Sequence, residues 1–422
     1  MRGHALKKRH IAAVVAGNAL EFYDFITYAF FAIQIGHSFF PGGAEKSLLY
    51  SLATFGAGFL TRPLGGLILG SLGDRIGRRP AMMISFSLMG VAILGVALTP
   101  SYAVIGVAAP VMVVFFRMLQ GFALGGEVGP TTAFLIEGAP PLRRGFYVAI
   151  TAASQDFSVL IAGAVGTIIA SVLPADQLQE WGWRIAFIVG ACIVPIGLIV
   201  RRSLPETLGE PDESGASPPR PAVRPYARLI VLILMMLACA TICNYTIDYM
   251  TTYANATLHM KANIAFGATF VIGLFSVSGD LVSGWLSDRF GRRITMIVPY
   301  ALMLLAVLPC FYFISHERTV VALYAATALL ATLQCLGGGP SVTILSESVP
   351  RRIRSGVVAT VYAFAIAAFG GSTQFMVTWI IDLTGDPLAP AYYMMGAVAL
   401  GLVAMALVKE TAPAKTGITQ SL

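Results

Sequence analysis

The 422-residue chain contains few charged residues. Asp, Glu, Lys and Arg together make up 12% of it, whereas soluble domains carry about 25%. Hydrophobic residues make up 57%, in repeated long runs, and about 20 consecutive apolar residues are enough to cross a bilayer as a helix. The scarcity of charge therefore excludes a set of soluble domains and predicts a polytopic membrane protein.

Motifs for several kinds of chemistry are also missing. Cys239 and Cys243 lie one helical turn apart, but no His and no second Cys pair accompanies them. We therefore interpret all five cysteines as small packing residues: Cys192, Cys239, Cys243, Cys310 and Cys335. The sequence has no Gly-rich Lys loop for nucleotide phosphates and no nucleophile–base motif. It therefore predicts neither an ATP-driven pump nor an enzyme. No cofactor is expected besides a coupling ion, which is a proton, with Na⁺ left open.

The apolar runs predict twelve membrane-spanning helices. Their approximate ranges are 11–37, 47–70, 81–99, 104–137, 145–172, 183–202, 228–258, 262–286, 294–314, 319–347, 355–383 and 391–408. With these ranges, 22 of the 28 Lys and Arg residues fall on one side of the membrane and four on the other. Both termini are therefore predicted to be cytoplasmic. The net charge of +7 reflects this topology, so nucleic acid is not an expected partner.

A ten-residue motif occurs twice, as GSLGDRIGRR at 70–79 and as GWLSDRFGRR at 284–293, with starting positions 214 residues apart. Each copy joins two apolar runs. Glu137 and Glu347 repeat in a similar register, and each precedes an Arg cluster. Two similar halves with the same basic hinge are typical of secondary transporters. The stretch 204–226, rich in Pro, Gly, Ser and acidic residues, predicts a flexible linker between halves 1–203 and 227–422.

The two hinge copies resemble the signature loops of the major facilitator superfamily. Further strings resemble its metabolite:H⁺ symporter branch, whose substrates include citrate, 2-oxoglutarate, shikimate, and proline or betaine. These strings are NALEFYDF at 18–25, RPLGG at 62–66, RMLQG at 117–121, GGE at 125–127 and WGWR at 181–184. Within the branch the chain is most similar to citrate and tricarballylate proton symporters, through ASQ at 153–155, RRSLPET at 201–207 and LTGD at 383–386.

This resemblance implies an all-α membrane fold of twelve helices in two pseudo-symmetric six-helix halves. It also implies a monomer in the plasma membrane, the inner membrane of a bacterium. The first functional hypothesis is proton-coupled import of a small carboxylate, citrate or a related tricarboxylate, by alternating access. The alternative substrates that stay open are a dicarboxylate, shikimate, and proline or betaine. A sensor that binds its ligand without transporting it is the alternative from another class.

Arg117 lies near the middle of predicted span 4, where a charged side chain costs about 2.5–3.5 kcal/mol on insertion scales. Gln120 and Glu127 share its helical face. A guanidinium offers two parallel donors to a carboxylate, so Arg117 is a candidate clamp for the substrate. The alternative is a structural ion pair with Glu21 or Asp24 of span 1. The two interpretations are compatible, because a carboxylate substrate can displace an internal partner.

Glu21 and Asp24 are two acids in one low-dielectric span, so one is expected to hold a proton near neutral pH. We therefore predict proton coupling through Asp24 first, with Glu21, Glu127 and Asp156 as further candidates. Arg62 of span 2 is either a second anion contact or a snorkelling side chain that packs. The packing interpretation is preferred here.

The second half has no Lys or Arg within its predicted membrane cores. Its polar groups include Asn244, Asp248 and Asp280. Its amides, hydroxyls and tyrosines suit recognition of shape and hydroxyl groups more than neutralisation of charge. Selectivity is therefore expected from the second half, and proton and carboxylate binding from the first. The predicted substrate contacts are Arg117, Asn18, Tyr28, Gln120, Gln155, Tyr245, Gln334 and Gln374.

The repeated hinges predict a cytoplasmic gate. Asp74 and Asp288 can bond helix N-termini or neighbouring Arg residues. Glu137 and Glu347 are suitable partners for Arg78 and Arg292, and in the family that the chain resembles such a network latches the outward-open state. The predicted gating residues are Asp74, Arg75, Arg78, Glu137, Asp288, Arg289, Arg292 and Glu347.

Overall fold

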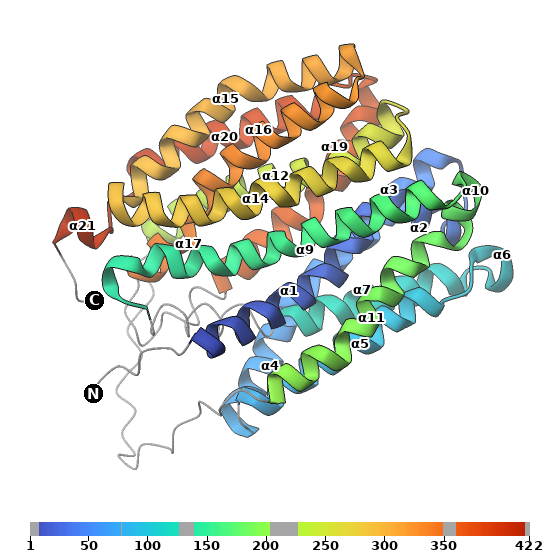
Figure 1. Ribbon diagram of the computed structural model, residues 1–422, viewed down its shortest axis with the longest axis horizontal. Helices are drawn as coiled ribbons and strands as arrows, with labels where there is room; N and C mark the ends of the chain where they lie inside the picture. Colours follow the sequence, from blue (N-terminus) through green and yellow to red (C-terminus); the bar gives the residue numbers. More distant parts are fainter. Residues whose placement is uncertain (1–7, 77, 126–138, 203–226, 349–359, 418–422) are drawn as a thin grey trace.

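Figure 1 shows the computed structural model, which describes residues 8–76, 78–125, 139–202, 227–348 and 360–417. Within these residues the chain forms helices and no strand, as the sequence predicts. Glu127, Glu137 and the predicted linker 204–226 lie outside the described residues.

The long helices of the first half are α1 (Lys8–Phe30), α3 (Ala44–Leu60), α4 (Arg62–Ile76), α5 (Arg78–Leu98), α7 (Ala108–Gly125), α9 (Arg144–Val172) and α11 (Trp183–Arg202). Shorter helical segments are α2 (Ala32–Phe39), α6 (Tyr102–Ile105), η1 (Pro141–Arg143), α10 (Ala175–Gln177) and η2 (Leu178–Gly182). The long helices of the second half are α12 (Ala227–Asp248), α14 (Ala262–Phe290), α15 (Arg292–Glu317), α16 (Val320–Gly338), α19 (Gly371–Thr384) and α20 (Ala389–Leu407). Its shorter segments are α13 (Met250–Thr252), η4 (Tyr253–Thr257), α17 (Pro340–Ser348), η5 (Ile366–Gly370) and α21 (Pro413–Thr416).

Ten helices within the described residues are long and apolar enough to cross a membrane, and a shorter apolar helix covers Met83–Leu98. Some are composite: Ala44–Leu69 joins α3 to α4 across Thr61, and Val320–Ser348 joins α16 to α17. Together α1 and α2 cover the first predicted span. The many-helix membrane architecture is therefore confirmed, while the count of twelve stays a prediction.

The two halves lie side by side along the bundle. In Figure 1 the first-half helices, coloured blue to green, lie below the second-half helices, coloured yellow to red. The halves meet mainly where α9 packs against α14 and where α3 packs against α19. Where α3 meets α19, a Cβ atom added to Gly56 would lie 2.3 Å from the carbonyl oxygen of Gly371, so the two backbones touch.

Small residues also bring α3 and α4 against α7 within the first half. A Cβ at Gly121 would lie 1.5 Å from the carbonyl oxygen of Gly58, and one at Gly125 would lie 2.0 Å from that of Arg62. Gly121 and Gly125 therefore let the backbone of α7 touch that of α3 and α4. Backbone contact this close leaves no room for a side chain.

The second hinge copy ties the two halves together at one end of the bundle. Asp288, in the last turn of α14, accepts hydrogen bonds from the backbone N–H groups of Gly145 and Phe146 at the start of α9, both at 2.9 Å. It also pairs with Nη1 of Arg292 at 2.7 Å, and Nη2 of Arg292 pairs with Glu347 at 3.0 Å. The predicted bonds of Asp288 to a helix N-terminus and of Arg292 to Glu347 are confirmed. We call Asp288, Arg292 and Glu347 the latch.

The other predicted gating residues take no described part in the latch. Arg289 is exposed, with its guanidinium carbon 5.5 Å from the centre of the Trp285 ring. The side chains of Asp74, Arg75 and Arg78 lie outside the described part of the chain. The gate predicted for the first hinge copy therefore stays a prediction.

The segment that follows α20 forms hydrogen bonds with the latch and with the start of α15. Glu410 accepts hydrogen bonds from the backbone N–H groups of Arg292 (2.9 Å) and Arg293 (3.0 Å) at the start of α15. Burial alone raises the pKa of Glu410, but these bonds and those from Thr411 and Ala412 outweigh it and hold the pKa below its ordinary value of 4.5. Thr411 in turn donates to Glu347 at 2.7 Å.

Gly121→Ala is expected to destabilise the protein by roughly 1–3 kcal/mol, since the new methyl group overlaps the Gly58 backbone. The measurement is the melting temperature in detergent. Gly396→Ala on α20 is the matched control, because no atom lies within 4 Å of a Cβ there. Equal melting temperatures for the two variants would contradict the backbone contact.

Asp288→Ala is expected to loosen the start of α9, because hydrogen bonds to a charged group contribute about 1.5–3 kcal/mol. Hydrogen–deuterium exchange at the amides of Gly145 and Phe146 should accelerate. Asp382→Ala, which removes an exposed carboxylate from α19, should leave that exchange unchanged. Unaltered exchange in Asp288→Ala would mean that the cap is not formed in the membrane.

Glu410→Gln is expected to lower the melting temperature at neutral pH. Because the pKa of Glu410 is depressed in the folded protein, its carboxylate stabilises the fold above pH 4.5, and this contribution is lost as the pH falls through the folded pKa. The difference from the parent should therefore shrink on acidification. Glu317→Gln, at the exposed far end of α15, serves as control. A difference that grows on acidification would reverse the assigned sign.

Candidate substrate and coupling site

A cavity of about 190 Å³ lies between the two halves. Its walls come from α1, α4 and α9 on one side and from α12, α14, α16 and α17 on the other. Its charged and amide-bearing lining residues are Arg62, Gln155, Asp156, Asn244, Asp280 and Gln334. Both signs of charge thus meet in one enclosed space, which is suited to a polar ligand.

Arg62 is the cation that borders this cavity. It begins α4 directly after the helix break at Thr61 and is 4% exposed. Its guanidinium carbon lies 4.3 Å from the ring centres of both Phe25 and Phe59. Its Nε and Nη2 atoms have no hydrogen-bond partner among the described residues. The packing interpretation accounts for the two rings, but the free donors next to a cavity also fit an anion contact.

Arg117 is fully buried in α7 behind this position and does not border the cavity. Its Nη1 donates to Oε1 of Gln120 at 2.6 Å, which confirms that the two side chains share a face. Its guanidinium carbon lies 4.4 Å from the ring centres of Phe25 and Tyr28. The side chains of Glu21 and Asp24 lie outside the described part of the chain, so the predicted ion pairs with them stay predictions.

Three of the predicted substrate contacts, Gln155, Tyr245 and Gln334, border the cavity. Both ends of the Gln334 amide are already engaged: Oε1 accepts from the Tyr300 hydroxyl at 3.0 Å, and Nε2 donates to the Ala240 carbonyl at 2.8 Å. Gln334 therefore shapes the wall more than it offers free groups.

The remaining predicted contacts lie in helix packing and not in the described cavity lining. Asn18 donates to Oγ of Ser154 at 2.7 Å and so ties α1 to α9. Tyr28 and Gln120 surround Arg117, and Nε2 of Gln374 lies 3.5 Å from the carbonyl oxygen of Tyr245.

The sequence did not indicate that two residues, Asp280 and Cys335, border the cavity. Asp280 was noted only as a polar group of span 8, although an acidic residue in the middle of a 29-residue apolar helix is a functional candidate on charge burial alone. Cys335 was interpreted as a packing residue, yet it borders the cavity beside Asp156 and Asp280. Its sequence context carries no signal for this placement.

Comparison with known proteins identifies the family. Residues 14–368 and 274–421 match the Major Facilitator Superfamily. The chain is 35% identical to the citrate-proton symporter of Klebsiella pneumoniae, over 93% of this chain and 90% of that protein. It is 30% identical to the proline/betaine transporter of Salmonella typhimurium, over 96% and 84%.

The fold is also similar to solved structures. The inward-open structure of the xylose transporter XylE from E. coli superposes with a TM-score of 0.76 over 98% of both chains, at 18% identity. That identity supports the fold and nothing finer. The family match along nearly the whole sequence, together with the 35% identical relative, establishes that the chain belongs to the Major Facilitator Superfamily of multi-pass membrane transporters.

Proposed function

We propose that the protein is a proton-coupled symporter that imports citrate or a related tricarboxylate by alternating access. The relative named as a citrate-proton symporter, 35% identical over most of both chains, supports the substrate and the coupling ion. The cavity between the halves supports alternating access, because rocking of one half against the other exposes such a site to each side in turn.

The observation that carries the proposal is the pair of buried guanidiniums. Arg62 and Arg117 stack on the same ring, that of Phe25, at 4.3 and 4.4 Å. Within the described residues neither has a carboxylate partner, and each keeps Nε and Nη2 without a hydrogen bond. An anion that enters beside Arg62 supplies both the countercharge and the acceptors.

Proton coupling follows from the charge of such a substrate. A potential that is negative inside opposes the entry of each negative charge by about 2.3 kcal/mol per 100 mV, and each accompanying proton cancels one charge. Asp24, Glu21, Glu127 and Asp156 are the proposed proton carriers. Of these, only the Asp156 side chain lies in the described part of the chain, where it borders the cavity.

The topology and setting belong to the same proposal. We place twelve helices in two halves, 1–203 and 227–422, joined by a cytoplasmic linker at 204–226, with both termini cytoplasmic in the inner membrane of a bacterium. The first residues of α1 and the end of α20 lie at the same end of the bundle, which agrees with this arrangement (Figure 1). The protein is proposed to act as a monomer without a cofactor, and with the latch as its cytoplasmic gate.

A zwitterionic substrate is the second candidate, because the proline/betaine transporter is 30% identical over 96% of the chain. A zwitterion needs one cation for its carboxylate, whereas a tricarboxylate profits from two. Radiolabelled citrate uptake into proteoliposomes under an imposed pH gradient tests the proposal, with unlabelled citrate, dicarboxylates, shikimate, proline and betaine as competitors. Citrate uptake that only proline or betaine inhibits, or no uptake at all, would contradict it.

Arg62→Ala and Arg117→Ala are each expected to raise the KM for citrate at least about tenfold, since a hydrogen bond to a charged group contributes about 1.5–3 kcal/mol. Arg62→Lys, which keeps the charge but loses the bidentate fork, should be intermediate. Arg318→Ala, which removes an exposed cation at the end of α15, should transport like the parent. Parental KM values in both core variants would refute anion binding at this pair.

A further inference from the structure

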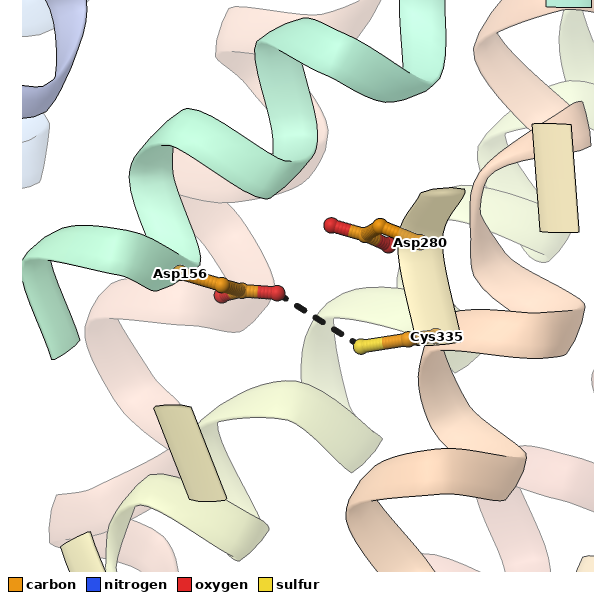
Figure 2. Close-up of side chains that lie close together, drawn as sticks. All are labelled: Asp156, Asp280 and Cys335. Atoms are coloured by element: carbon orange, nitrogen blue, oxygen red, sulfur yellow. Dashed lines mark hydrogen bonds between the residues drawn. The ribbon is translucent and has the colours of Figure 1, made fainter. Parts of the chain in front are cut away.

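Asp156, Asp280 and Cys335 form a cluster across the boundary between the two halves (Figure 2). Asp156 comes from α9 of the first half, while Asp280 and Cys335 come from α14 and α16 of the second. One carboxylate oxygen of each Asp and the Cys335 sulfur all lie within 4.8 Å of one another. Sγ of Cys335 donates to Oδ2 of Asp156 at 3.5 Å. All three side chains border the central cavity.

The carboxyl group of Asp280 is buried and lacks a hydrogen-bond partner for one of its oxygen atoms among the described residues. It is 4% exposed, and its Oδ2 has no partner among the described residues. In a low-dielectric interior an unpartnered carboxylate oxygen is costly, and two carboxylates this close repel each other. One proton bound by the pair removes the repulsion, because the protonated acid then donates to the other one.

The packing of α9 on α14 holds the two carboxyl groups together. On one side of the cluster a Cβ at Gly273 would lie 2.3 Å from the backbone nitrogen of Leu160. On the other side a Cβ at Gly284 would lie 2.6 Å from Cβ of Ala149 and 2.8 Å from Cα of Phe146. With both flanks in contact, the carboxyl groups separate only when the helices themselves move, as alternating access requires.

The surroundings favour a proton over another cation. No Lys or Arg of the described residues forms an ion pair with Asp156 or Asp280, although Arg62 borders the same cavity. Asp156 acts electrostatically on Asp248 of α12 and on Tyr362, and Asp248 accepts a hydrogen bond from Asn244 at 3.1 Å. Hard cations such as Na⁺ prefer a shell of oxygen ligands, whereas the third member of this cluster is a thiol.

We propose that the Asp156–Asp280 pair is the binding site of the coupling proton, and that the halves close on each other at this depth only when the pair holds it. This inference rests on the proposed proton-coupled function. The proton enters from water in the cavity, forms an O–H bond on one carboxylate, and returns to water when α9 and α14 part towards the cytoplasm. No other bond changes. Cys335 positions Asp156 through its thiol hydrogen bond.

The test compares two transport modes of the purified protein in proteoliposomes: citrate accumulation driven by a pH gradient, and citrate–citrate exchange without a gradient. Asp156→Asn and Asp280→Asn mimic the protonated state, so both should keep exchange and lose accumulation above equilibration. The double variant should behave like either single one, because the pair acts as a unit. Asp176→Asn, which changes an exposed acid, is the control for both modes.

Each outcome bears on a different claim. If the parent shows no gradient-driven citrate uptake, the proposed function fails, and exchange by the variants still reports whether they fold. If the parent accumulates citrate and the Asp variants do so equally, the pair is not the coupling site. Loss of exchange together with accumulation would also overturn the inference, since it makes the pair necessary for movement itself. Uptake driven by a Na⁺ gradient at equal pH would assign the site to Na⁺.

Discussion

The cost of leaving charge uncompensated in a low-dielectric interior governs the centre of this protein. Among the described residues, Arg62 and Arg117 meet this constraint only in part, through the faces of Phe25 and its neighbouring rings, and their Nε and Nη2 atoms have no hydrogen-bond partner. Cation–π contacts stabilise a desolvated guanidinium by about 2 kcal/mol, less than a carboxylate partner does. Their free donors are the reason that we propose an anionic substrate for this site.

Close packing of α9 against α14 connects the centre of the protein to the latch. The same two helices, α9 and α14, carry the acid pair near their middle and the Asp288 cap at one end. Their backbones touch at Gly273 and Gly284. Any motion that changes access to the cavity thus acts on the acids and on the latch together, which is a physical basis for coupling.

The two halves differ in chemistry. The first half supplies both central cations, and the second supplies Asn244, Asp248 and Asp280. Among the described residues, Asp156 and Asp280 bring two carboxyl groups together across the boundary. A site divided in this way is assembled when the halves approach, so binding energy is available to drive closure.

The sequence by itself determined the class of the protein. Long apolar runs, the doubled hinge and the basic excess on one side are local properties, and they predicted a helical transporter with Asp288 and Arg292 as bonded partners. The sequence also identified the charged residues inside the spans of the first half, because a charged residue in an apolar run can be recognised without knowing which residues it contacts. Only the tertiary structure decided which of these residues border the cavity: Arg62 does and Arg117 does not, although both sit in apolar helices. The pairing of Asp156 with Asp280 was likewise decided by tertiary structure, because it depends on how α9 and α14, which are distant in the sequence, rotate and cross. Helical periodicity carries no information on that register.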